Sequence, residues 1–130
     1  MKRIALLLAL AAGATGCTTT PGTGWSRAPD LSVYAAMDDF AEIAREQAVL
    51  CGGFSPGVVA SHWEEDFGAR ETGVRAALVS KHGVEALDTA IETRAPRVAC
   101  ESVPTLRWRH RYERLLRLLE ARLGLVQERS

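Results

Sequence analysis

The spacing of apolar residues constrains the fold of this chain more than any other feature. From Asp30 onward, apolar side chains return every three, four or seven positions, which is the period of an α-helix with one buried face. The chain has no alternating apolar run of useful length and no Asn-Gly or Asp-Gly turn, the usual signals of strands and hairpins. The sequence therefore predicts an all-α domain, a small bundle of four or five helices.

The first predicted helix spans residues 31–51, with Asp30 as its N-cap. Gly52 and Gly53 follow Cys51 and supply the left-handed residue that commonly ends a helix. The apolar stripe of this helix consists of Val33, Met37, Phe40, Ile43 and Leu50.

A second helical run begins at Ser55, an N-cap residue that is followed by Pro56 at the first helical position. Its apolar residues recur at four-residue spacing. Those in its first half are Val59, Trp63 and Phe67.

Glycines weaken the middle of this second run. Because Gly68 and Gly73 disfavour a continuous helix, we expect a break near residues 68–72, with Thr72 capping a new helix. Lys81-His82-Gly83 then has the character of a helix end, with cations near the negative pole and glycine after it. A shorter helix over 84–94 follows, and Pro96 ends it.

The final predicted helix spans residues 105–126 and is capped by Thr105. Leu118 and Leu125 fall outside its buried arc, beside several arginines, so we expect a surplus apolar edge there. The residues of the buried arc are Trp108, Tyr112, Leu115, Leu116, Leu119, Leu123 and Val126.

The amino terminus has the three-part layout of a secretory signal: positive residues 1–3, apolar residues 4–12 and small residues 13–16. The apolar run has roughly half the length that a spanning helix needs. The tetrad Ala14-Thr15-Gly16-Cys17 resembles the lipobox of bacterial lipoproteins, although leucine is commonest where this chain has Ala14. The resemblance covers the signal region alone.

The resemblance implies that residues 1–16 are removed and that the sulfur of Cys17 receives diacylglycerol. Thr18 in place of aspartate further implies the periplasmic side of the outer membrane. The alternative is cleavage after Ala14, which would release the protein into the periplasm without an anchor. Residues 17–29 are small and polar with Pro and Gly, so we expect a flexible tether ahead of a helical domain over 30–130.

The chain contains 3 cysteines. With Cys17 acylated, Cys51 and Cys100 remain, and an even pair in an exported domain predicts a disulfide. Closing a loop of roughly 50 residues stabilises a fold by about 4 kcal/mol when only chain entropy is counted.

Charge is balanced overall but unevenly distributed. The 16 basic residues equal the 16 acidic ones, which argues against a nucleic-acid partner. Residues 101–130 are basic, whereas residues 30–71 are acidic.

Three interpretations of the basic final helix follow. It neutralises the acidic helices within the domain; or it lies on anionic lipid with Trp108 and Tyr112 at the interface; or it binds a protein. The residues that would serve the last interpretation are Leu118 and Leu125, with Arg111 and Arg114 beside them.

One cluster could carry chemistry. His62, Glu65 and Asp66 share a helix face and could hold a metal or form an acid–base pair, but no H-E-x-x-H motif is present. We expect a solvated acidic face there, and neither G-x-S-x-G nor a P-loop occurs. The sequence thus predicts a non-catalytic envelope lipoprotein without cofactors. Its expected partner is another envelope protein or a second copy, with membrane association through 105–126 as the alternative.

Overall fold

The computed structural model describes residues 24–92, Cys100 and residues 106–125, and every regular element in these ranges is helical. The predicted all-α class is therefore confirmed. The elements are η1 (Trp25–Arg27), α3 (Asp30–Leu50), α4 (Pro56–Trp63), the π-helical η2 (Glu64–Gly68), α5 (Ala69–His82), α6 (Val84–Ala90) and α7 (Arg107–Arg122).

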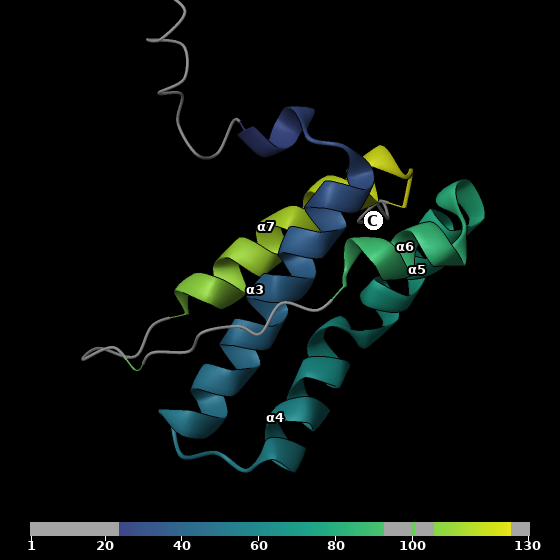
Figure 1. Ribbon diagram of the computed structural model, residues 1–130. Helices are drawn as coiled ribbons and strands as arrows, with labels where there is room; N and C mark the ends of the chain where they lie inside the picture. Colours follow the sequence, from purple (N-terminus) through teal and green to yellow (C-terminus); the bar gives the residue numbers. More distant parts are fainter. Residues whose placement is uncertain (1–23, 93–99, 101–105, 126–130) are drawn as a thin grey trace, which may run out of the picture.

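Helix α3 is the centre of the bundle. It packs along α7 on one side, while α4 and α6 contact it as well, and α5 touches both α6 and α7 (Figure 1). Within the described ranges, no helix is both long enough and apolar enough to cross a membrane.

Helix α3 ends as predicted but begins differently. Gly53 has a φ of 77°, the left-handed conformation expected after the helix. The N-cap is Pro29 and not Asp30, which is the first residue of the helix itself. The prediction of Asp30 as N-cap was wrong because its carboxylate accepts from Lys81 and Arg122 instead of from its own helix.

The expected break near residues 68–72 is absent. Helix α4 starts at Pro56, with Ser55 accepting from the backbone N–H of Val58 at 3.3 Å, and runs through η2 into α5. The wider turn of η2 keeps the chain helical through Gly68, where a Cβ atom would collide with the Glu64 carboxylate. Thr72 is consequently an exposed residue within α5 and caps nothing.

The last two helices are shorter than predicted. Helix α6 ends at Ala90 and not at residue 94, although Gly83 before it has the expected positive φ of 94°. Helix α7 covers 107–122 of the predicted 105–126. Its N-cap is Leu106, without a side-chain hydrogen bond, while the predicted cap Thr105 and the last residue Val126 lie outside the described residues.

The core lies where α3, α5, α6 and α7 converge, and it has aromatic rings at one end. Trp63, Phe67 and Tyr112 contact one another with all three pairs of ring centroids 4.8 Å apart. The largest fully buried side chains are Tyr112, Leu78, Leu87, Leu116, Leu119, Val33 and Val74.

Cys51 and Cys100 form the predicted disulfide, with Cα atoms 5.5 Å apart. The bond joins the end of α3 to the stretch of chain between α6 and α7. These positions are 49 residues apart in sequence, so the disulfide ties the end of α3 covalently to the chain segment that precedes α7.

Candidate functional site

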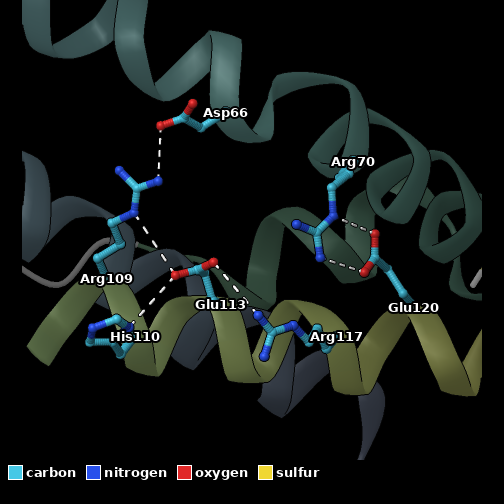
Figure 2. Close-up of polar contacts among 7 residues, drawn as sticks. All are labelled: Asp66, Arg70, Arg109, His110, Glu113, Arg117 and Glu120. Carbon is cyan, nitrogen blue, oxygen red and sulfur yellow. Dashed lines mark hydrogen bonds and ion pairs between the residues drawn. The ribbon is translucent and has the colours of Figure 1, made fainter. Parts of the chain in front are cut away.

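Helix α7 meets the acidic helices through direct ion pairs, so the interpretation that the domain neutralises itself is confirmed. Arg109 on α7 donates to Asp66 on η2 at 2.9 Å (Figure 2). Further along α7 the charges are exchanged: the acidic residue, Glu120, is on α7, and it accepts from the basic residue Arg70 on α5. The sequence predicted the attraction between the two halves but not this exchange of signs.

Of the ion pairs between α7 and the helix that runs from α4 to α5, the Arg70–Glu120 pair has the most favourable hydrogen-bond geometry. Arg70 Nε and Nη2 donate to the two carboxylate oxygens of Glu120 at 2.9 and 2.7 Å, the two-pronged geometry that suits a guanidinium. The side chain of Glu120 is only 14% exposed. The side-chain hydrogen bonds to Glu120 raise the pKa of Arg70.

The free energy that couples Arg70 to Glu120 can be measured by removing each side chain separately and both together. In a double-mutant cycle with Arg70→Ala and Glu120→Ala, we expect a coupling energy of about 1 kcal/mol, the upper end for pairs near the surface. Urea denaturation of the four proteins measures it. The matched cycle of His62→Ala and Glu65→Ala should show no coupling, because those side chains are 71% and 72% exposed and 3.7 Å apart. Equal coupling in both cycles would contradict the assignment.

Glu113 lies near three basic side chains of its own helix. Its carboxylate lies 3.9 Å from Arg109 Nε, 3.8 Å from His110 Nδ1 and 3.8 Å from Arg117 Nη2 (Figure 2). These separations are too long for good hydrogen bonds, so Glu113 lowers the local positive potential without fixing any one of the three side chains.

The candidate metal or acid–base cluster does not converge. Asp66 turns to Arg109, while His62 and Glu65 extend into solvent. The described residues hold no group of three His, Cys, Asp or Glu side chains placed to bind a metal ion. The geometry at residues 62–66 matches the solvated acidic face that we expected.

Tyr112 is a core residue and not an interface residue. It is completely buried, and its hydroxyl donates to Glu71, which also accepts from Trp63 Nε1 at 3.1 Å. Burial and the hydrogen bond to Glu71 both raise the pKa of Tyr112. The prediction that Tyr112 lies at a lipid interface was wrong, because the α4–α5 helix covers that face of α7.

Trp108 also packs within the domain and not at an interface. Its ring lies 5.7 Å from that of Phe40, and the Arg111 guanidinium stacks over it at 5.0 Å. Arg111 therefore covers an aromatic pair, whereas Arg114 is exposed and makes no ion pair with another described residue.

The predicted surplus apolar edge is covered. Leu118 and Leu125 are partly buried and pack against the core, as does Trp25 of η1. Residues 25–28 fold back beside α7, where Arg122 donates to the backbone oxygens of Trp25, Ser26 and Ala28 at 2.6–2.8 Å. A helical projection of α7 alone does not show this covering segment, so the prediction of an exposed edge was wrong.

A hollow of about 330 Å³ remains between η1 and α7. We call it the η1–α7 hollow. Its lining is apolar at the floor and basic at the rim, and it consists of Trp25, Ser26, Arg114, Leu115, Arg117 and Leu118.

A second surface lies at the turn between α3 and α4. Leu50 is 64% exposed, Phe54 58% and Val58 46%. We call these three residues the apolar tip. Leu50 was predicted to face the core, but the chain turns at Gly52 and Gly53 before any helix covers it. Phe54 was missed, although an aromatic residue between a glycine pair and a helix start was a visible signal.

Compared with known proteins, the chain matches no family model, no curated protein and no solved structure. The two surfaces above are therefore the basis for any functional assignment.

Proposed function

We propose that this protein is a non-catalytic lipoprotein of the bacterial cell envelope, whose helical domain uses the apolar tip to bind another envelope protein. The leader and the lipobox-like residues 14–17 support export and acylation at Cys17. The exposure of the apolar tip is the observation that carries the binding role. Three large apolar side chains exposed around one turn of the chain mark an interaction site more often than a single exposed leucine does.

The position of the tip favours a protein partner over the anchoring membrane. The tip lies at the carboxyl end of α3, and the tether joins the domain near its amino end (Figure 1). The 21 residues of α3 span roughly 30 Å. Residues 17–24 reach at most about 25 Å when fully extended. The tip therefore lies at the opposite end of α3 from the point where the tether joins the domain.

The tip offers shape and apolar contact but little charge. Phe54 supplies the large flat side chain typical of binding hot spots, with Leu50 and Val58 beside it. The partner that this chemistry fits is an apolar groove or helix face on a protein at the same membrane. A position on the periplasmic side of the outer membrane accords with Thr18 after the acylated cysteine.

Crosslinking in intact envelopes tests the proposal. A photoreactive phenylalanine analogue at Phe54 should give a heavier adduct, and mass spectrometry of that adduct names the partner. The control places the same analogue at Val84, which is 48% exposed at the turn between α5 and α6. We expect adducts from position 54 and none from position 84.

The outcomes are distinct. Equal adducts at both positions, or none at either, would overturn the role of the tip. An adduct of this chain with itself would make a second copy the partner. The intact mass of the same preparation tests the anchor, because a chain beginning at Thr15 without acyl mass would replace anchoring with simple secretion.

A further inference from the structure

We infer that the η1–α7 hollow binds the anionic phospholipid of the membrane to which the chain is anchored. It is a different surface from the apolar tip, and only its proximity to the lipid rests on the proposed anchor. The hollow combines the two features that a phospholipid requires: an apolar floor for the acyl–glycerol region and cations for the phosphate.

The lining supplies this chemistry directly. Trp25, Leu115 and Leu118 provide the apolar surface, and Arg114 and Arg117 stand at its rim. Among the residues that the structure describes, no acidic side chain belongs to this lining. The two guanidinium groups give the lining a positive formal charge, which is complementary to a phosphodiester.

The two arginines are able to turn toward a ligand. Arg114 is exposed and makes no ion pair within the described ranges. Arg117 has a side chain that is 70% exposed, and its one acidic neighbour, Glu113, lies 3.8 Å away. Neither guanidinium gives up a strong contact when it binds an anion.

The hollow also lies where the anchor would place lipid. Trp25 lines it, and the backbone oxygen of Trp25 is fixed to α7 by Arg122 at 2.8 Å. Residues 17–24 reach at most about 25 Å, so acylation of Cys17 would hold the hollow within that distance of the bilayer. Tryptophan is enriched at membrane interfaces, where its ring sits among the headgroups.

The combination favours a bilayer lipid over a free anion. Inorganic phosphate would contact the arginines alone and leave Trp25, Leu115 and Leu118 unused. The earlier expectation of lipid contact through Trp108 and Tyr112 is replaced, because those residues are packed against α3, α4 and η2.

Vesicle partitioning of the chain without its acylated cysteine tests the inference. Residues 18–130 retain every element of the described fold, and circular dichroism would verify their helicity. At an ionic strength of about 0.1 M we expect strong partition onto vesicles that mix phosphatidylcholine with phosphatidylglycerol, and weak partition onto phosphatidylcholine alone. Arg114→Gln and Arg117→Gln should each weaken it about fivefold, and the double variant about 25-fold.

The control removes the same charge elsewhere. Arg75 lies on α5, does not line the η1–α7 hollow, and pairs with Asp88 at 3.5 Å. At ionic strengths near 0.1 M the screening length is about 10 Å, so Arg75→Gln should leave partition nearly unchanged. An equal loss in Arg75→Gln, or no preference for anionic vesicles, would overturn the inference.

Quenching of tryptophan fluorescence by brominated phospholipid tests whether the lipid contacts Trp25 in the η1–α7 hollow. We expect quenching that is lost in Trp25→Phe, because Trp63 is only 8% exposed and the half-buried Trp108 packs against Phe40 under the Arg111 guanidinium. Quenching that persists in Trp25→Phe would place the lipid elsewhere. None of these results depends on adducts at Phe54, so this inference and the proposed function fail separately.

Discussion

Reducing the Cys51–Cys100 disulfide is expected to lower the free energy of unfolding by about 4 kcal/mol. The two cysteines are 49 residues apart, so the bond closes a long loop and removes many conformations from the unfolded chain. It also ties the end of α3 to the chain that leads into α7. For a domain of this size, the loss corresponds to a fall of about 20 °C in the melting temperature.

Urea denaturation with and without reductant, and of the Cys51→Ser/Cys100→Ser variant, measures this effect. The variant and the reduced protein should agree, because both remove the same crosslink. Cys17→Ser is the matched control and should leave the midpoint unchanged, since Cys17 precedes the described domain. If the doubly substituted protein fails to fold at all, the reduced wild type still gives the comparison. An unchanged midpoint after complete reduction would contradict the prediction.

Replacing Arg122 with glutamine is expected to cost about 3 kcal/mol. Its guanidinium donates to three backbone oxygens of residues 25–28 and to Asp30 Oδ1 at 3.1 Å, and its side chain is 22% exposed. A hydrogen bond with a charged partner contributes about 1.5–3 kcal/mol, and water recovers part of that near the surface. The loss should also free Trp25 from α7, which a red shift in tryptophan emission would report.

The matched control is Arg117→Gln on the same helix. The side chain of Arg117 is 70% exposed and its pairing distance is 3.8 Å, so its effect on the urea midpoint should be small. Equal losses in the two variants would show that Arg122 is an ordinary surface charge.

Because Asp30 is one of the partners of Arg122, the loss of stability in Arg122→Gln should depend on pH. Desolvation raises the pKa of Asp30, but hydrogen bonds from Lys81 and Arg122 outweigh it and hold this pKa below the ordinary value of 3.8. A carboxyl group with a lowered pKa stabilises the fold above its unfolded pKa, and this stabilisation is lost as the pH falls through the folded value. The difference between wild type and Arg122→Gln should therefore narrow below about pH 4, leaving the part due to the backbone oxygens.

The features that the sequence predicted correctly are short-range ones. The start of α4 at Ser55 and Pro56, and the helix ends at Gly53 and Gly83, depend on residues within one helical turn. Such signals are complete in the local sequence, because a cap or a left-handed residue needs no distant partner. The buried arc of α7 was equally clear, since Leu115, Leu116 and Leu119 recur with the helical period.

The wrong predictions about Leu50, Leu118 and the break near residue 70 share one cause, because each depends on packing between segments that are distant in the sequence or on a different helix. Leu50 continues the apolar stripe of α3 but extends past the last helix that packs there. Leu118 lies outside the arc of α7 but is covered by a segment more than 90 residues earlier, as the contacts of Arg122 with residues 25–28 show. Glycines near residue 70 suggested a break, and packing of Phe67 and Val74 holds one helix together instead.

The sequence by itself determined that this chain forms helices, where α4 begins, which glycines follow α3 and α5, and which cysteines pair. Those outcomes follow from local backbone preferences and from the even pair that remains beside Cys17. Only the tertiary structure decided which apolar and charged residues stay available: it buried Tyr112, covered Leu118 in part, and left the apolar tip and the η1–α7 hollow open. Whether a side chain is exposed depends on which other segment packs against it, and distant segments of a chain meet only in the folded state.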